Sequence, residues 1–85
     1  AYTREAILGL NENQMGVYGI FNGNECVYIG RGDIRERMLA HWNGDIPCIN
    51  GRSPVQWVGW LVANQVSVEQ DLILEFTPTC NQRVG

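Results

Sequence analysis

The sequence of 85 residues contains no lysine and a single histidine, His41. Without lysine, the chain lacks a lysine base, a lysine Schiff base and a Walker-type clamp for phosphate. Every fixed positive side-chain charge is therefore an arginine guanidinium, whose planar fork suits the oxygens of a phosphate group. Because the chain also has no Cys-x-x-Cys pair, a structural zinc site is not expected.

Long apolar runs are missing as well. No segment approaches the roughly 20 apolar residues of a membrane-spanning helix. The chain does not open with the basic, apolar and cleavage-site segments of a signal peptide. The length predicts a single domain over residues 1–85. We therefore expect a cytoplasmic protein without membrane contact, and we expect reduced, mostly buried thiols at Cys26, Cys48 and Cys80.

Negative charge exceeds positive charge by three, and the excess is uneven along the chain. Residues 31–52 carry four arginines and three acidic residues, a local charge of +1. The rest carries two arginines and six acidic residues, a local charge of −4. A net charge of −3 argues against a protein that binds nucleic acid by bulk electrostatics alone.

A hairpin is the clearest β structure. Two segments rich in β-branched and aromatic residues flank an Asn-Gly-Asn-Glu turn. Tyr18 and Tyr28 lie on the same face of this hairpin only if the loop has an odd number of residues or a β-bulge adds one. We predict a three-residue loop at 23–25, which places Tyr28 opposite Ile20.

The clearest helix covers residues 33–42. Asp33 and Glu36 form a capping box at its start. Arg37 and His41 are four residues apart, so they lie one turn above the other on the helix surface. An apolar stripe beside them faces the core and consists of Ile34, Met38 and Trp42.

The remaining elements follow from periodicity and turn residues. The third strand is apolar on both faces, so we expect both to be covered. Ser67 and Gln70 form a capping box that opens the last helix, and Pro78 ends it. The predicted ranges are 3–10 for a first helix, 16–21 and 26–30 for the hairpin strands, 43–53 for an irregular loop, 54–63 for the third strand, 67–77 for the last helix and 79–85 for an extended tail.

Glu69 is out of place on the last helix. It precedes Leu72, Ile73 and Phe76 by three, four and seven residues, which puts it on or beside the buried stripe. A carboxylate near apolar surface must be paired, protonated or bound to a metal. The structural alternative is an acidic residue favoured by the helix dipole.

The other candidates also have ordinary structural explanations. Arg37 and His41 suit a solvated helix face. Tyr18 and Tyr28 suit the core, and Asn81 suits a loop in which it satisfies local backbone groups. Three aromatic residues are expected in the core rather than as platforms for nucleobases: Trp42, Trp57 and Trp60.

The order of these residues resembles the GIY-YIG nuclease family. Gly16-Val17-Tyr18 corresponds to the first signature triplet, with valine in place of isoleucine, and Tyr28-Ile29-Gly30 is the second triplet unaltered. The family continues with an arginine and, in several branches, a histidine on the next helix, then a glutamate that opens a later helix and an asparagine after it. These positions are Arg37, His41, Glu69 and Asn81. The resemblance covers roughly residues 16–81, and five ordered elements make it specific.

Two further positions depart from the family pattern. The spacing from Gly30 to Arg37 is one residue shorter than in many members, which leaves Arg35 as a rival for the site arginine. Arg31 replaces a common lysine. Arginine does not accept a proton, but its charge can bias a nearby tyrosine toward phenolate.

The resemblance implies an α/β (α+β) fold with a small three-stranded antiparallel sheet flanked by helices, the GIY-YIG endonuclease fold. It implies a metal-dependent endonuclease that hydrolyses phosphodiester bonds of DNA with one Mg²⁺ or Mn²⁺. Target selection is expected to involve a partner protein, an added domain or a homodimer. Arg31 and Arg35 are expected to bind substrate, and the implied catalytic residues are Tyr18, Tyr28, Arg37, His41, Glu69 and Asn81.

Each catalytic residue receives a role by this resemblance. Glu69 holds the metal, and Arg37 binds phosphate and stabilises the transition state. Tyr18 is the first choice for the base and Tyr28 the rival, provided that cationic neighbours lower the tyrosine pKa from its ordinary value of roughly 10. His41 relays that proton or binds phosphate. A further residue, Asn81, positions Glu69 or a water.

Two other functions stay open on the sequence. One is a catalytically inactive GIY-YIG module that binds nucleic acid without cutting it, which the negative net charge favours. The other is a structural or protein-interaction domain. Geometry is its discriminator: Tyr18 and Tyr28 on opposite sides of the sheet, or Glu69 far from Arg37, would make the constellation a coincidence of spacing.

Overall fold

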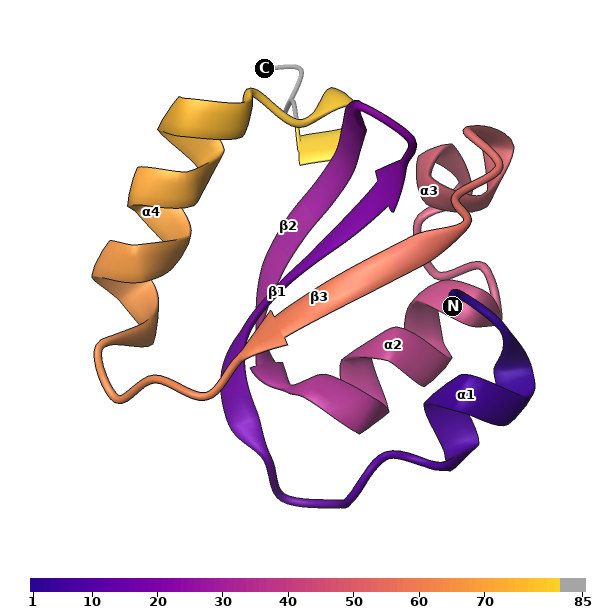
Figure 1. The fold of residues 1–85 in the computed structure, drawn as a ribbon, viewed down its shortest axis with the longest axis horizontal. Helices are drawn as coiled ribbons and strands as arrows, with labels where there is room; N and C mark the ends of the chain where they lie inside the picture. The colour runs from indigo at the N-terminus through magenta and orange to yellow at the C-terminus, as the bar shows by residue number, and fades with distance from the viewer. Residues whose placement is uncertain (82–85) are drawn as a thin grey trace.

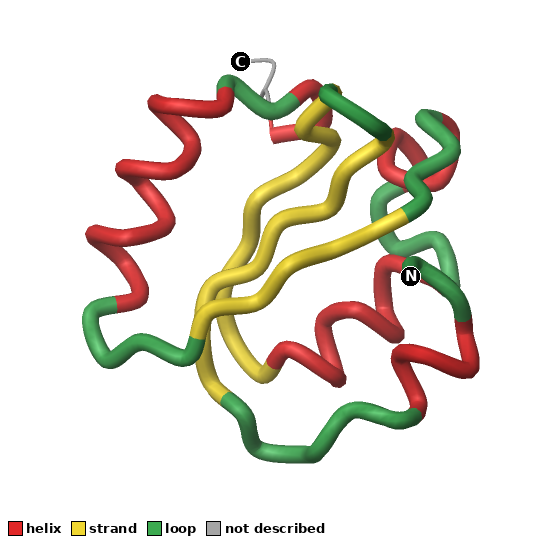
Figure 2. Tube along the Cα trace, viewed as in Figure 1, coloured by secondary structure: helices red, strands yellow, loops and turns green. Residues whose placement is uncertain are grey.

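A three-stranded antiparallel sheet with strand order β2-β1-β3 forms the centre of the molecule (Figure 1). The computed structural model describes residues 1–81. The central strand β1 spans Met15–Asn22, and its neighbours are β2 (Glu25–Asp33) and β3 (Gln56–Trp60). Helices lie on both sides of the sheet, which confirms the predicted architecture (Figure 2).

The two faces of the sheet carry separate apolar clusters. On one face, Tyr18 and Ile20 of β1 pack with the buried Ile7, Met38 and Ile49 of three helices. Those helices are α1 (Arg4–Leu8), α2 (Ile34–Trp42) and α3 (Pro47–Gly51). Because side chains alternate along a strand, Val17 and Ile29 face the other side. There they pack against helix α4 (Gln65–Phe76), through Val68, Leu72 and Ile73.

The hairpin pairing is as predicted, but its loop is not. Tyr28 lies opposite Ile20, and Asn22 pairs with Glu25, so the loop has two residues rather than three. A β-bulge supplies the extra residue, because the register shifts between Ile20 and Phe21. Gly23 has a positive φ of 57°, which suits so tight a turn. A longer loop and a bulge have the same effect on side-chain facing, and the sequence does not separate them.

Strand β3 is less covered than expected. It is shorter than residues 54–63 and pairs only with β1 within the described chain, so it forms an edge of the sheet. Val58 is 43% exposed on it, and Trp57 and Trp60 are half-buried. Trp42, expected in the core, is 37% exposed. An apolar run indicates a strand but does not fix its place in the sheet, because exposed apolar residues are common.

The N-cap residues predicted from the sequence are correct for the start of α2 and wrong for the start of α4. Asp33 caps α2 as predicted, since its side chain accepts a hydrogen bond from the backbone N–H of Glu36. Helix α4 begins at Gln65, two residues before the predicted start, with Asn64 as its N-cap and without a side-chain cap. The hydroxyl of Ser67 donates instead to the carbonyl of Asn64, one turn earlier.

Two segments expected to be irregular or extended are helical. The loop after α2 contains α3, which begins at Pro47, a residue suited to the first position of a helix. The tail forms a 3₁₀ turn, η1 (Thr79–Asn81), and the rest of the tail, 82–85, lies outside the described residues. In residues 1–81, no helix combines the length and the apolar character needed to cross a bilayer.

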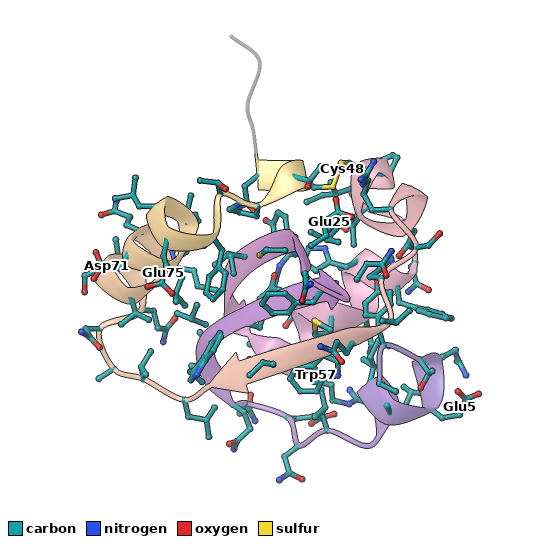
Figure 3. The ribbon with its side chains drawn as sticks, turned by 45° about the horizontal axis from the view of Figure 1, so that its top comes forward. Glu5, Glu25, Cys48, Trp57, Asp71 and Glu75 are labelled. Atoms are coloured by element: carbon teal, nitrogen blue, oxygen red, sulfur yellow. A yellow bond between two sulfur atoms is a disulfide. The ribbon has the colours of Figure 1, made fainter. Side chains whose placement is uncertain are left out.

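A disulfide between Cys48 and Cys80 joins α3 to η1 (Figure 3). The prediction of three reduced thiols is therefore wrong for this pair, and Cys48 is exposed rather than buried. Their Cα atoms are 5.7 Å apart although 32 positions separate them in the sequence. Only the fold brings them together, so their spacing gave no signal. Cys26 is free and buried, as predicted.

Candidate active site

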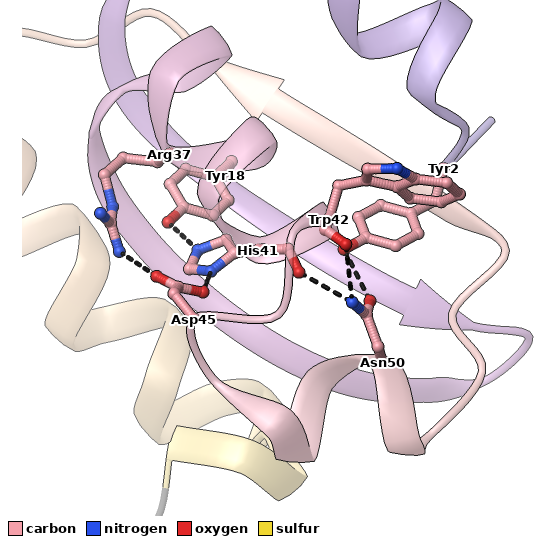
Figure 4. A network of polar contacts seen from close by, with 7 residues as sticks. All are labelled: Tyr2, Tyr18, Arg37, His41, Trp42, Asp45 and Asn50. Carbon is pink, nitrogen blue, oxygen red and sulfur yellow. Dashed lines mark hydrogen bonds and ion pairs between the residues drawn. The ribbon is translucent and has the colours of Figure 1, made fainter.

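A hydrogen-bonded network links the sheet to α2 (Figure 4). It is buried at Tyr18 and His41 and partly exposed at Arg37 and Asp45. The hydroxyl oxygen of Tyr18 lies 2.6 Å from Nε2 of His41, whose side chain is fully buried. The other ring nitrogen, Nδ1, lies 2.8 Å from Oδ1 of Asp45. Arg37 donates from Nη2 to Oδ2 of the same carboxylate at 3.2 Å. Tyr18, Arg37 and His41, three residues singled out from the sequence, therefore meet in one place.

Tyr28 completes this cluster from the neighbouring strand. Its ring centroid is 5.0 Å from that of His41 and 6.3 Å from that of Tyr18. Tyr18 and Tyr28 thus share a face of the sheet. Phenols on opposite sides of the sheet, the first of the two geometries that would indicate a coincidence of spacing, are therefore not found.

Glycine at position 30 makes room for the Tyr18 phenol. Gly30 lies opposite Tyr18 in the hairpin, and a Cβ atom there would collide with the Tyr18 hydroxyl. Gly16 has a comparable role at the start of β1, where a Cβ would overlap the carbonyl oxygen of Trp60. The glycines of both signature triplets therefore have a packing reason in this chain.

The electrostatics of the network differ from the expectation for Tyr18. Burial raises the pKa of Tyr18 well above its ordinary value, and the nearby Tyr28 raises it further. A hydrogen bond and the charge of Arg37 oppose this shift without reversing it. The condition set for Tyr18 as a base, a pKa lowered by its cationic neighbours, is therefore not met, because desolvation outweighs the effect of the Arg37 guanidinium.

His41 and Asp45 have the protonation states of a neutral imidazole beside a carboxylate. Burial lowers the pKa of His41 more than its contact with Asp45 raises it, and the charge of Arg37 lowers it further. Burial acts to raise the pKa of Asp45, but the contacts with His41 and Arg37 dominate and lower it. Near neutral pH, His41 is therefore uncharged and Asp45 ionised.

Glu69 approaches β2 from the face that α4 covers. Arg31 donates from Nε to Oε1 of Glu69 at 3.2 Å, and their side chains are 49% and 21% exposed. Arg31 follows Ile29 by two residues, so it shares the α4 face of the strand. Tyr28 on the same strand faces α2. Glu69 and Tyr28 are thus brought to β2 from opposite faces of the sheet. The structure does not bring Glu69 into the hydrogen-bonded network of Tyr18, Arg37 and His41, because its carboxylate bonds to Arg31 instead.

Asn81 binds the free edge of β2. Its Oδ1 accepts from the backbone N–H of Ile29, and its Nδ2 donates to the carbonyl of Ile29, both at 2.8 Å. The amide therefore pairs with the strand as a neighbouring residue of a sheet would, directly beside Tyr28. This is a structural role, and the predicted role of Asn81 in positioning Glu69 or a water stays a prediction.

The structure favours Arg37 over Arg35 as the arginine of the cluster. Arg35 is oriented toward Glu12, in the segment before β1, with an ion pair of 3.5 Å. Arg37 contacts Asp45 and keeps 37% of its side chain exposed, so it is available to a ligand.

The comparisons with known proteins bear on the fold. No family model and no curated protein sequence matches the chain. Solved structures do match: the GIY-YIG N-terminal endonuclease domain of UvrC from Thermotoga maritima, bound to magnesium as its catalytic divalent cation, has a TM-score of 0.77 and 25% identity over 93% of this chain and 94% of that one. A tyrosine-to-phenylalanine mutant of that domain, also bound to its catalytic cation, has a TM-score of 0.76 and 26% identity over 94% of each chain.

The chain has the fold of a GIY-YIG domain.

A metal site with few protein ligands fits the residues of this domain. Within residues 1–81, no three His, Cys, Asp or Glu side chains lie close enough together to hold a metal ion. Glu69 offers a single carboxylate that is partly exposed to water. Magnesium is commonly held by one or two carboxylates, with water completing its coordination, so Glu69 suits it as the one protein ligand. The adjacent Arg31 charge opposes a cation there.

The sequence patterns did not single out Asp45, which the structure places in the network. It lies beyond the end of α2, and the sequence offered it only as one charge among nine acidic residues. A usable signal was its position four residues after the single histidine, with glycine between the helix end and the carboxylate. Gly44 has a positive φ of 90°, which turns the chain so that Asp45 returns to His41.

Proposed function

We propose that this GIY-YIG domain is a metal-dependent endonuclease that hydrolyses phosphodiester bonds of DNA. The observation that carries the proposal is the convergence of Tyr18, Arg37 and His41 in one network with Tyr28 against it. Such a cluster brings together a proton acceptor, a phosphate-binding cation and two phenols on one face of a rigid sheet. Simple core packing does not require a guanidinium and an imidazole there.

The network supplies two of the needs of phosphodiester hydrolysis. Arg37 binds the phosphate oxygens and offsets the negative charge that develops on them. Tyr18 accepts a proton from the attacking water while its own proton moves to Nε2 of His41, 2.6 Å away. Because burial raises the pKa of Tyr18, a standing phenolate is not expected at neutral pH. The two transfers are therefore coupled.

The metal complements these residues. A bound Mg²⁺ or Mn²⁺ supplies Lewis-acid stabilisation of the phosphate oxygens and lowers the pKa of bound water. Glu69 would hold it, as the only carboxylate of the proposed site on α4. Asn81 would act by fixing the β2 backbone beside Tyr28. Arg31 would bind the substrate backbone.

The proposed substrate is DNA, and the proposed location is the cytoplasm. A further component is proposed to select the cleavage site. The net charge of −3 implies weak attraction to DNA, so a partner protein, an added domain or a homodimer would select the site of cleavage. A cytoplasmic location stays a prediction. The Cys48–Cys80 disulfide fits it poorly, since cytosolic thiols are normally kept reduced.

The test compares Glu69→Gln and Arg37→Ala with the wild type on plasmid, single-stranded and branched DNA and on RNA, with Mg²⁺ or Mn²⁺. Both variants should lose cleavage by about 100-fold or more. Glu75→Gln is the matched control, because Glu75 is exposed farther along α4 and should cut normally. Full cleavage by both site variants would reject the site, and cleavage of RNA alone would reject the substrate.

The alternative, a GIY-YIG module that binds nucleic acid without cutting it, has one observation in its favour. Arg31 already neutralises Glu69, the carboxylate that would hold the metal. A metal titration discriminates the two functions. The nuclease should bind Mg²⁺ in a way that Glu69→Gln abolishes, whereas the inactive module should show the same weak binding in both proteins.

A further inference from the structure

We propose that Asp45 is a positioning residue that holds His41 in the tautomer able to accept the proton of Tyr18. The proposal rests on the proposed nuclease function for its catalytic consequence. It rests on the geometry of the network alone for its structural content. Asp45 belongs to neither signature triplet and lies outside the helix that carries His41.

The hydrogen-bonding capacity of each group determines the direction of the chain Tyr18–His41–Asp45. An ionised carboxylate only accepts hydrogen bonds, so the proton between Asp45 and His41 resides on Nδ1 of the ring. A neutral imidazole carries one ring proton, so Nε2 presents a lone pair. Tyr18 is therefore the donor across the 2.6 Å contact. In the other tautomer, Nδ1 would direct its lone pair at the carboxylate, and Nε2 could not accept from Tyr18.

The carboxylate of Asp45 also sets the place of Arg37. Its Oδ1 contacts His41, and its Oδ2 accepts from Arg37. One rigid group thus fixes the relation between the proton acceptor and the phosphate-binding cation. Because well-oriented groups lower the entropy cost of reaching the transition state, this double contact favours a defined approach of the phosphate.

Hydrogen bonds of the surrounding chain hold Asp45 beside His41. The backbone N–H of Asp45 donates to the carbonyl of Ala40, beyond the turn at Gly44. Asn50 on α3 donates from Nδ2 to the carbonyls of His41 and Trp42, at 2.8 and 3.0 Å. These bonds tie α3 to the end of α2, so both ends of the loop that carries Asp45 are held (Figure 4).

Two proton transfers, from water to Tyr18 and from Tyr18 to His41, take place without protonating Asp45. As water attacks, its O–H bond breaks and a new O–H bond forms on Tyr18. The original O–H bond of Tyr18 breaks, and an N–H bond forms on Nε2 of His41. Nδ1 keeps its proton, and the Asp45 carboxylate stabilises the resulting imidazolium. The titratable and charged groups around the ring are Tyr18 from β1, Tyr28 from β2, Arg37 from α2 and Asp45 from the loop after α2.

The first experiment reads the tautomer directly, without any substrate. Nitrogen-15 NMR of the single histidine in the wild-type protein should show a neutral ring with its proton on Nδ1. In Asp45→Asn, an amide replaces the carboxylate and can donate to Nδ1, so the ring proton should move to Nε2. A wild-type ring protonated on Nε2, or a tautomer unchanged in Asp45→Asn, would overturn the proposal.

The second experiment reads catalysis. Asp45→Asn should lower kcat about 100-fold with KM nearly unchanged. It should also move the acidic limb of the pH profile to lower pH, because the His41 imidazolium loses its counter-charge. Asp45→Glu should restore part of kcat, and Asp71→Asn, at an exposed position of α4, is the matched control. Thermal unfolding of every variant checks that it is folded.

The outcomes keep the two proposals apart. A wild type that cuts no substrate rejects the nuclease function, while the tautomer still tests the role of Asp45. A wild type that Glu69→Gln inactivates, together with an Asp45→Asn variant of unchanged kcat and pH profile, rejects the role of Asp45 and keeps the nuclease. If Asp45→Asn does not fold, the wild-type tautomer and the pH profile of Asp45→Glu decide.

Discussion

Asn81 binds both the N–H and the carbonyl of Ile29, a residue 52 positions earlier in the chain. The side chain thereby pairs with the edge of β2 as the backbone of a neighbouring strand would. An edge strand without such a partner leaves its polar groups to solvent and is prone to fray. The C-terminal turn thus holds the strand that carries Tyr28.

Replacing Asn81 by alanine should therefore loosen β2. The loss of two hydrogen bonds, at part-buried positions, should lower the free energy of unfolding by about 1–3 kcal/mol. Urea unfolding measures the loss, and hydrogen exchange of the Ile29 amide should become faster. Asn11→Ala, at an exposed position before β1, should leave both unchanged. Equal exchange at Ile29 in the two variants would contradict this role.

Reduction of the Cys48–Cys80 disulfide should destabilise the fold. Its two cysteines are 32 positions apart, and opening a loop of this length returns roughly 3–4 kcal/mol of chain entropy to the unfolded state. Urea midpoints with and without a thiol reductant measure the change. Cys48→Ser should match the reduced protein and no longer respond to reductant. A wild-type midpoint that reductant leaves in place would show that the bridge adds no stability.

Gly30→Ala should displace the phenol of Tyr18. A Cβ at this position would collide with the hydroxyl, and overpacking of this kind costs about 1–3 kcal/mol. The contact of Tyr18 with His41 should lengthen, and the NMR signals of the His41 ring should shift. Gly51→Ala is the control, since a Cβ there would meet no atom within 4 Å apart from its chain neighbours and the backbone of its own helix. Similar spectra for both variants would argue against close packing over Gly30.

The sequence predicted the parts of this fold that depend on neighbouring residues. The strands of the hairpin follow from runs of β-branched and aromatic residues, and the start of α2 follows from Asp33 and its bond to Glu36. The helical spacing of Arg37 and His41 placed both on one side of α2. These features are set over a few residues, so a local pattern contains them.

The missing parts depend on contacts between distant segments. Nothing near Cys48 indicates Cys80, and nothing in the apolar run of β3 indicates an edge rather than a central strand. The pairing of Asn81 with Ile29 belongs to the same class. The raised pKa of Tyr18 could not be predicted from the sequence either, because it depends on how deeply the ring is buried. Local signals thus found the candidate residues but not their protonation states.

Acid should destabilise the protein in two steps. The pKa of His41 is lowered on folding from the ordinary value of 6.5, so below that pH the unfolded chain takes up a proton that the folded protein does not. Stability therefore falls as pH decreases from about 7. The pKa of Asp45 is also lowered, from 3.8, so its contribution is present above that pH and is lost as pH falls through the folded value.

His41→Gln tests the first step, because glutamine does not titrate. The free energy of unfolding from urea, measured between pH 7 and pH 5, should decline more in the wild type than in His41→Gln. The variant should be less stable at pH 7, since it leaves Tyr18 and Asp45 with altered partners in a buried site. Parallel pH curves for the two proteins would mean that His41 is not the group responsible.

Arg31 should have opposite effects on the metal and on DNA. Its guanidinium lies 3.2 Å from the Glu69 carboxylate, so it neutralises the charge that would attract Mg²⁺. Since the pair is partly exposed, its removal in Arg31→Gln should tighten Mg²⁺ binding only about two- to fivefold. DNA binding should weaken, because a phosphate-contacting cation is lost.

Calorimetric titration with Mg²⁺ measures the metal affinity, and fluorescence titration measures the DNA affinity. Arg35→Gln is the matched control. Because Arg35 pairs with Glu12 instead, it should leave the metal affinity unchanged. Weaker Mg²⁺ binding in Arg31→Gln would mean that Arg31 supports the ion rather than competing with it, and Glu69 would then have to be reconsidered as the metal ligand.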